Sequence, residues 1–254
     1  IPKVVVGSID PYSEVDGKGI LKLQNASVDV VSRVIESECI FLNRRFYTFH
    51  TKKRPYIILK WAQTSDGFID RLRSAESKEK PAWITNEFCK TLVHKWRTEE
   101  DAILVGKNTV TLDNPQLTAR NWCGRNPLRI CIDRMCELNI KCKIFDENAD
   151  TIVINELKNL VEKNIKYIKV NFLENFLPQL MEILYKENIQ SIIIEGGTKT
   201  LTEFISNNLW DEARIFYSSE KFENGVKAPS FCEKEKFSKK YDNTELKIYY
   251  NEKS

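Results

Sequence analysis

The residues with most promise for chemistry follow a run of branched apolar residues near position 195. Glu195 ends the run 191–195, and Gly196 and Gly197 come directly after it. Two glycines let a ligand approach the backbone closely, and Thr198 opens a segment with helical apolar spacing. Because the first turn of a helix presents N–H groups and positive charge, the sequence predicts a pyrophosphate site here. The turn matches neither the GxGxxG fingerprint nor a Walker A loop.

Polar residues also follow three other apolar runs. They are the segment 60–67, the segment 106–120 with Asp113 and Arg120, and Arg134. Ligands of open α/β sheets bind beyond the carboxyl ends of the strands, so we expect these segments to lie close together. Each also has an ordinary structural explanation, namely a strand turn, a capped helix followed by an Asp-Pro loop, and a surface arginine.

The elements that must position these residues are strands alternating with helices. Continuous apolar runs predict buried strands over 56–61, 102–106, 128–133, 151–154 and 191–195. Helices are expected from Asn86, with Phe88, Leu92 and Trp96 on the buried face, over about 173–187, and after Gly197. This alternation predicts an α/β layered fold with a mostly parallel central sheet. Strands over 212–218 and 245–251 would add an antiparallel edge, and the charged stretch 233–240 is expected to be a solvated loop.

The first fifty residues have a separate pattern. Strands are expected over 4–6 and 28–31, a short helix over 20–23 and a longer helix over 36–46. The basic segment 48–54 looks like a connection, and we place a domain boundary after residue 52.

Composition excludes several classes of protein. The 254 residues include 39 Lys and Arg against 36 Asp and Glu, which leaves a formal charge of +3. General nucleic-acid or membrane-surface binding needs clustered excess positive charge, and no apolar run approaches the about 20 residues of a membrane span. Seven cysteines without a CxxC pair and two histidines give no metal-ligand spacing. We therefore expect a cytoplasmic protein with reduced thiols and no metal of its own.

Several segments in one order resemble the reductase domain of the bacterial RibD family of riboflavin biosynthesis. These segments are 54–69, 83–120, 126–134, 192–205 and 209–216. The resemblance runs from about Lys53 to the end of the chain. It implies a dihydrofolate-reductase-like fold. It also implies an enzyme that reduces the small molecule 5-amino-6-(5-phosphoribosylamino)uracil to its ribitylamino product with NADPH.

Residues 1–52 resemble the tail of the family's deaminase domain. That domain's His-Ala-Glu and Pro-Cys…Cys zinc motifs do not occur in this sequence. The resemblance therefore implies a deaminase remnant over 1–52, a reductase domain over 53–254, and a bifunctional enzyme whose zinc belongs to a part of the deaminase domain outside this sequence. The first residue is Ile1 rather than Met, which suggests a piece of a longer protein. We also expect a homodimer.

The resemblance assigns roles to single residues of this sequence. Substrate contacts match Arg97, Leu117, Arg120 and Glu195, and the two arginines match those that hold the ribose phosphate with forked guanidinium groups. NADP contacts match Ala62, Trp83, Thr109, Asp113, Gly197, Thr198, Lys199, Thr200 and Leu201. Lys60, Asp113 and Glu195 are the candidates for handling ribose hydroxyls and protons.

Two positions depart from the family pattern. Arg134 stands where relatives often have Ser, and it would either bind the 2′-phosphate of NADP or point to solvent. Pro81 stands where relatives often have a substrate-contacting Ser, so that contact is not expected here.

Other interpretations stay open. The chain could be a catalytically silent nucleotide-binding module, or the reductase of the pathway order in which reduction precedes deamination. It could also be an RNA-binding domain that uses Arg44, Arg45 and the basic run 52–54. Trp83 and Trp96 could be core aromatics, and Arg97 could pair with Glu100 on its own helix. The proton donor is not assigned and could be water.

Overall fold

The computed structural model of the chain describes residues 1–12, 14–73 and 83–252, so Pro81 lies outside the described residues. The chain divides into two compact units. Unit 1 contains residues 1–56 and 181–190, and unit 2 contains residues 57–180 and those from 191 onward. The predicted domain boundary after residue 52 stays a prediction.

Unit 1 begins with a small parallel sheet. Strand β1 (Lys3–Val6) pairs with β2 (Asp29–Ser32), and helix α1 (Lys18–Asn25) connects them. These elements confirm the expected strand–helix–strand order. Helices α2 (Glu36–Leu42) and α3 (Arg44–Lys52) follow.

The expectation of one helix over 36–46 and then a connection was wrong. The helix ends at Asn43, whose side-chain Nδ2 donates to the Cys39 carbonyl at 3.0 Å, and a second helix runs on to Lys52. That second helix is stabilised by burial of Phe49, which packs on Tyr185 with ring centroids 4.7 Å apart. The helix was not predicted because basic residues surround Phe49 and leave no apolar pattern in this segment.

Unit 2 is built on a ten-stranded sheet in the order β13-β14-β11-β3-β10-β5-β6-β7-β9-β8. Its strands are β3 (Tyr56–Gln63), β5 (Ala102–Gly106), β6 (Leu128–Ile132), β7 (Thr151–Asn155), β8 (Leu160–Glu162), β9 (Ile165–Lys169), β10 (Ser191–Ile194), β11 (Glu212–Ser218), β13 (Phe237–Tyr241) and β14 (Thr244–Tyr250). β4 (Phe68–Asp70) and β12 (Val226–Lys227) form a separate pair.

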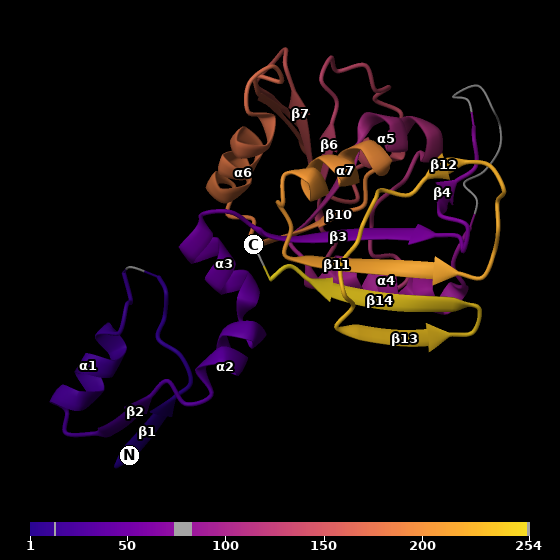
Figure 1. The fold of residues 1–254 in the computed structure, drawn as a ribbon. Coiled ribbons are helices and arrows are strands. Elements are labelled where there is room, and N and C mark those ends of the chain that lie inside the picture. Colours follow the sequence, from indigo (N-terminus) through magenta and orange to yellow (C-terminus); the bar gives the residue numbers. More distant parts are fainter. Residues whose placement is uncertain (13, 74–82, 253–254) are drawn as a thin grey trace. The chain divides into compact units, whose positions relative to one another are not determined.

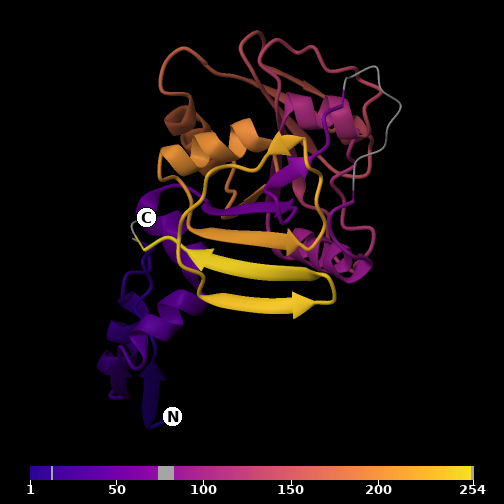
Figure 2. The ribbon, with the colours of Figure 1, turned by 45° about the vertical axis from the view of Figure 1, so that its right-hand side comes forward.

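The sheet is mostly parallel, as predicted. The pairs β10–β5, β5–β6, β6–β7, β7–β9 and β11–β3 are parallel, and β14 and β13 form the antiparallel edge seen in Figures 1 and 2. The stretch 233–240 was expected to be a loop but contributes β13. Almost every side chain of that edge strand is exposed, so it carries no apolar pattern.

The helices are α4 (Glu87–Glu99), α5 (Lys107–Asp113), α6 (Phe176–Lys186) and α7 (Thr198–Ser206), with a 3₁₀ turn over Lys143–Phe145. Asn86 caps α4 as predicted, because its Oδ1 accepts from the Cys89 N–H at 2.9 Å. The predicted buried face of α4 was right at Trp96, which is 7% exposed, but wrong at Phe88, which is 57% exposed; Cys89 and Val93 are the other buried apolar residues.

The sheet brings the predicted strand ends to one edge. β5, β6, β7 and β10 run parallel and have buried centres, which are apolar apart from Arg129 of β6. Their carboxyl ends therefore meet, and α5 and α7, which start there, lie side by side in both views (Figures 1 and 2). Across the described residues, no helix has the length and apolar character needed to cross a membrane.

Candidate active site

An ion pair joins α4 to the end of β10. Arg97 Nη2 donates to Glu195 Oε2 at 2.9 Å, and Arg97 Nη1 donates to the Thr118 carbonyl at 3.1 Å. Each of the two charged side chains is 11% exposed. A carboxylate and a guanidinium this deeply buried are costly to keep unless both are fully bonded.

These groups are not fully bonded within the described protein. Arg97 Nε, Glu195 Oε1, Thr118 Oγ1 and His94 Nδ1 are buried and have no hydrogen-bond partner among the described residues. Buried polar atoms are nearly always paired in native structures. Several orphaned atoms in one place indicate a site that a polar ligand completes. Lys60 and Arg120 interact with Arg97 through their charges. We call these two residues and the four with unpaired atoms the Arg97 cluster; its members are Lys60, His94, Arg97, Thr118, Arg120 and Glu195.

Lys60 contributes a half-buried side chain from β3. Burial lowers the pKa of Lys60, and the charge of Arg97 acts in the same direction, whereas Glu195 opposes the shift. Burial alone would raise the pKa of Glu195, but the charges of Arg97 and Lys60 outweigh burial, and that pKa is lowered. Glu195 is therefore ionised between two cations, and one of its oxygens stays available.

Arg120 contributes an exposed guanidinium group. It has no hydrogen bond or ion pair to any residue that the structure describes, and partial burial and the charge of Arg97 lower its pKa. Two guanidinium groups that repel each other become favourable when a dianion lies between them. The pair is suited to a phosphate group.

His94 lies against the same arginines. It is 3% exposed, and burial, Arg97 and Arg120 together lower its pKa to about 4. The imidazole is therefore neutral at pH 7. His94 was not predicted from the sequence, although its spacing of three residues from Arg97 places both on one face of α4.

The glycine turn lies at the start of α7, beside α5. The Gly197 N–H donates to Thr109 Oγ1 at 3.0 Å, and no side chain caps the first turn of α7. The first N–H groups of a helix have no intrahelical acceptor. A Cβ at Gly197 would lie 3.5 Å from Thr109 Oγ1, so the space above this residue is open on the protein side. These features fit a pyrophosphate group, and Thr109 and residues 197–201 lie together as predicted.

Asp113 has a partner that the sequence did not indicate. Its Oδ1 accepts from Arg73, whose guanidinium is 3% exposed and also bonds Asp70 of β4. Burial raises the pKa of Asp113, and Arg73 partly offsets the shift. Nothing in the sequence around Arg73 predicted this contact, because it joins residues 40 positions apart.

The remaining predicted residues are more scattered. Arg134 donates to Glu156 Oε2 at 2.5 Å, and its guanidinium lies 5.7 Å from the centre of the Phe172 ring. Trp83 is 62% exposed with the Lys90 ammonium 4.6 Å from its ring centre. Ala62 is half-buried on β3, while Leu117 and Leu201 are buried. The structure thus brings Lys60, Arg97, Arg120 and Glu195 together but gives Arg134 a protein partner.

The cysteines and acidic residues that the structure describes form no metal centre. All seven cysteines are free, and in residues 1–12, 14–73 and 83–252 no group of His, Cys, Asp and Glu could hold a metal ion.

Comparisons with known proteins identify the relatives. Residues 55–251 match the family model described as the RibD C-terminal domain. The riboflavin biosynthesis protein RibD of Aquifex aeolicus is 37% identical over 221 residues, which are 85% of this chain and 61% of that protein. The chain therefore spans about three fifths of the length of this curated relative. A 2,5-diamino-6-ribosylamino-4(3H)-pyrimidinone 5′-phosphate reductase of Archaeoglobus fulgidus is 32% identical over 74% of this chain and 90% of its own length.

A solved structure is similar over nearly the whole chain. It is a diaminohydroxyphosphoribosylaminopyrimidine deaminase/5-amino-6-(5-phosphoribosylamino)uracil reductase from Thermotoga maritima, with a TM-score of 0.85 and 34% identity over 99% of this chain and 72% of that one. The family match covers most of the sequence and the fold agrees with this structure. The chain belongs to the RibD C-terminal domain family.

Proposed function

We propose that this chain reduces 5-amino-6-(5-phosphoribosylamino)uracil to 5-amino-6-(5-phosphoribitylamino)uracil with NADPH. The observation that carries the proposal is the Arg97 cluster, in which Arg120 has no partner among the described residues and Arg97 leaves its Nε unbonded. A dianionic ribose phosphate would satisfy both guanidinium groups.

The residues at the start of α7 fit the cofactor. Thr109, Gly197, Thr198, Lys199, Thr200 and Leu201 would hold the pyrophosphate and its flanking groups, with the open face of Gly197 allowing close approach. NADPH, when bound, would supply the hydride that is added at the ribose C1′. The other proposed cofactor contacts are Ala62, Trp83, Asp113 and Arg134. Asp113 would bind the cofactor while it also accepts from Arg73, and Arg134 while it also donates to Glu156.

Lys60 and Glu195 are the proposed polar groups at the reacting ribose. The ammonium of Lys60 can donate to a ribose oxygen, and the open Oε1 of Glu195 can accept from a ribose hydroxyl. Both interactions would orient C1′ and exclude bulk water. A proton must also reach the product, and Lys60, whose positive charge helps to lower the pKa of Glu195, is a candidate to donate it.

A direct assay tests the proposal. Purified protein mixed with the phosphoribosylaminouracil and NADPH should lose nicotinamide absorbance at 340 nm, and the product should be the ribityl compound by mass spectrometry. NADH at the same concentration tests the cofactor preference. Absence of turnover and of NADPH binding would refute the proposal.

A second candidate substrate is the pyrimidine before deamination. The relative from Archaeoglobus fulgidus carries that substrate class in its name and matches 74% of this chain. Reducing both compounds in competition decides between them, since the selectivity is the ratio of the two kcat/KM values.

Further proposals concern the protein as a whole. We propose that residues 1–52 are the remnant of a deaminase domain in a bifunctional cytoplasmic enzyme, that zinc belongs only to the rest of that domain, and that the protein is a homodimer. Light scattering of the purified chain and metal analysis test the last two statements.

A further inference from the structure

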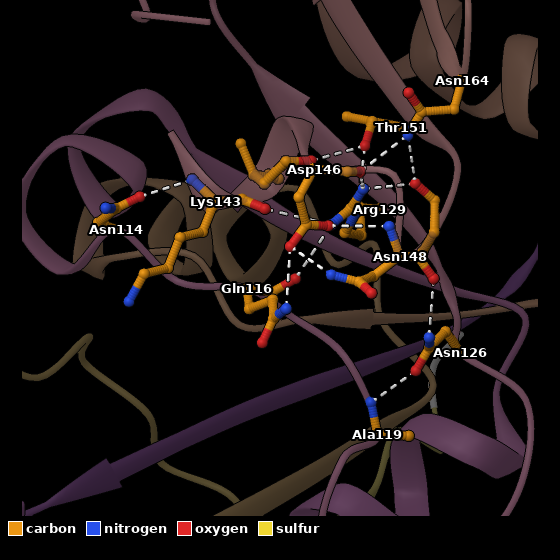
Figure 3. A network of polar contacts seen from close by, with 12 residues as sticks. Asn114, Gln116, Ala119, Asn126, Arg129, Lys143, Asp146, Asn148, Thr151 and Asn164 are labelled. Atoms are coloured by element: carbon orange, nitrogen blue, oxygen red, sulfur yellow. Dashed lines mark hydrogen bonds and ion pairs between the residues drawn. The ribbon is translucent and has the colours of Figure 1, made fainter. Parts of the chain in front are cut away.

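Arg129, near the start of β6, makes an unusually large number of hydrogen bonds for one side chain. It is fully buried, and its Nε donates to Thr151 Oγ1 at 3.1 Å. Its Nη1 donates to Asp146 Oδ1 at 2.6 Å and to the Gln116 carbonyl at 3.4 Å. Its Nη2 donates to the carbonyls of Asp146 and Ala149. Figure 3 shows the guanidinium at the centre of this network.

The network ties one loop to the segment that precedes β7. This loop, residues 114–120, connects α5 to the region before β6 and carries Leu117, Thr118 and Arg120. Asn114 Oδ1 accepts from the Lys143 N–H at 2.7 Å, and Gln116 Nε2 donates to Asp146 Oδ2 at 2.9 Å. These two bonds and the one from Arg129 hold the first half of the loop (Figure 3).

The second half of the loop is tied by Asn126. The Ala119 N–H donates to Asn126 Oδ1 at 2.9 Å, and Asn126 Nδ2 donates to the Asn148 carbonyl at 2.9 Å. Asn148 in turn donates from Nδ2 to Asp146 Oδ2 at 2.8 Å. Both halves of the loop are therefore connected to the segment 146–148, and Figure 3 shows this chain of contacts.

The residues between these ties belong to the Arg97 cluster. Thr118 is 3% exposed, and its carbonyl accepts from Arg97 Nη1 at 3.1 Å. Leu117 is held at φ 57°, a conformation that L-residues adopt only where the surroundings impose it. Arg120 is the last residue of the loop and directly follows Ala119. The position of the Arg120 guanidinium, and part of the support of Arg97, therefore depend on how the loop is held.

We propose that Arg129 is a positioning residue for binding of the substrate phosphate: with Asp146 and Asn126 it fixes the 114–120 loop so that Arg120 and Arg97 can hold one dianion. The inference rests on the proposed function. Arg129 touches neither Arg97 nor Arg120 in any described contact, so it acts through the loop backbone. Arginine suits this role because one rigid fork satisfies several carbonyls and a carboxylate at once.

The test compares variants by their kinetic constants and by binding of ribose 5-phosphate as a probe. Arg129→Lys keeps the charge but loses the fork. Asn126→Ala removes the bonds to the Ala119 N–H and the Asn148 carbonyl and changes an exposed residue, so it tests the inference even if the first variant fails to fold. We expect KM for the phosphorylated substrate and the dissociation constant of ribose 5-phosphate to rise by about tenfold or more. The KM for NADPH and kcat should change by less than about twofold, as expected when ground-state binding is lost.

Asn164→Ala is the matched control. Asn164 Nδ2 donates to the same carbonyls of Asp146 and Ala149 but bonds no residue of the loop. This variant should lower the melting temperature while KM for the substrate stays unchanged. A purely structural role for Arg129 would instead make all three variants lose stability and leave the substrate KM of folded enzyme unaltered.

The outcomes separate the inference from the proposed function. A wild-type chain that turns over the substrate, together with loop variants of unchanged KM, overturns the inference alone. A wild-type chain that neither reduces the substrate nor binds ribose 5-phosphate overturns the proposed function and the inference with it. An equal loss of affinity for NADPH and ribose 5-phosphate in Asn126→Ala also overturns the inference.

Discussion

Arg97 donates from Nη2 to Oε2 of Glu195 across 2.9 Å, although the two residues are 98 positions apart in the sequence. The alternative partner, Glu100, which directly follows α4, accepts from Arg214 Nη2 at 3.2 Å instead. The pair therefore fixes the carboxyl end of β10 to α4. The two arginines therefore differ: Arg97 is bonded to Glu195 and Thr118, whereas Arg120 has no bond to any residue that the structure describes.

This difference predicts unequal effects of the two arginine variants. Arg120→Ala removes an exposed side chain that has no described partner, so the melting temperature should stay close to wild type. It should raise KM for the phosphorylated substrate by about 10- to 100-fold, which corresponds to about 1.5–3 kcal/mol for a charge-assisted contact. Steady-state kinetics with the substrate and with NADPH measure both values.

Arg97→Ala serves as the contrast. It leaves Glu195 buried without its guanidinium, which costs about 3–5 kcal/mol of folding stability. An Arg120→Ala enzyme with unchanged KM for the substrate would show that the phosphate binds elsewhere.

The charge of Glu195 should matter for turnover more than for cofactor binding. Glu195→Gln keeps the size but removes the negative charge that opposes the lowering of the Lys60 pKa. The pKa of Lys60 should then fall further, and the alkaline limb of the pH–rate profile should move to lower pH. We expect kcat/KM for the substrate to fall by about 100-fold.

The NADPH dissociation constant, measured by fluorescence titration, is the control for this variant. A Glu195→Gln enzyme that keeps the wild-type pH profile would contradict the proposed coupling of Glu195 to Lys60.

The central strands of the sheet were predictable because strands buried on both faces have continuous apolar sequences. Ile103, Ile130 and Ile193 lie in short strands whose centres are buried on both faces. The edge strand β13 and the break of the helix at Asn43 were not predictable from such sequences. Almost every side chain of β13 is exposed, and the helix after Asn43 has the packing of Phe49 on Tyr185, a residue distant in the sequence.

The candidate site was predictable only in part. Residues at strand ends, such as Glu195 and Gly197, are located by the sheet itself. The resemblance to a family supplied Arg97 and Arg120. His94, Arg73 and Arg129 were missed because their importance comes from partners distant in the sequence, and a single sequence does not show which of its charged residues are buried.

His94 should make folding stability depend on pH in a defined window. Its folded pKa of about 4 lies below the ordinary value of 6.5, so the unfolded chain binds more protons between these limits. Stability should therefore be unaffected above pH 6.5 and should fall by about 3 kcal/mol as the pH is lowered to about 4. Urea unfolding at several pH values measures this slope.

The His94→Gln variant is the control for that slope, because glutamine does not titrate and has a similar reach. The wild-type slope between pH 6.5 and 4 should be reduced in this variant. If both proteins lose stability in parallel over this interval, His94 is not the titrating group.

The glycine turn allows a test that separates the fold from the cofactor. A Cβ at Gly196 would lie 3.0 Å from Thr200 Cβ and 3.1 Å from the Gly106 nitrogen, whereas a Cβ at Gly197 meets only Thr109 Oγ1 at 3.5 Å. Gly196→Ala should therefore lower the free energy of unfolding by about 1–3 kcal/mol, an amount typical of overpacking, and the melting temperature should fall with it. Gly197→Ala should leave the melting temperature almost unchanged, because its φ of −56° is open to any L-residue.

NADPH binding should be affected in the opposite order: Gly197→Ala should weaken it more than Gly196→Ala does. If the pyrophosphate lies on the first turn of α7, the added methyl group at Gly197 stands between the backbone and the phosphate oxygens and weakens NADPH binding by about tenfold or more. Gly197→Val should weaken binding further, since a branched Cβ fills more of the same space. Thr109→Ala removes the acceptor of the Gly197 N–H and should have a smaller effect, because the turn is only loosened. Isothermal titration with NADPH ranks the variants. A folded Gly197→Val protein with wild-type NADPH affinity would place the pyrophosphate away from this turn and overturn the cofactor half of the site.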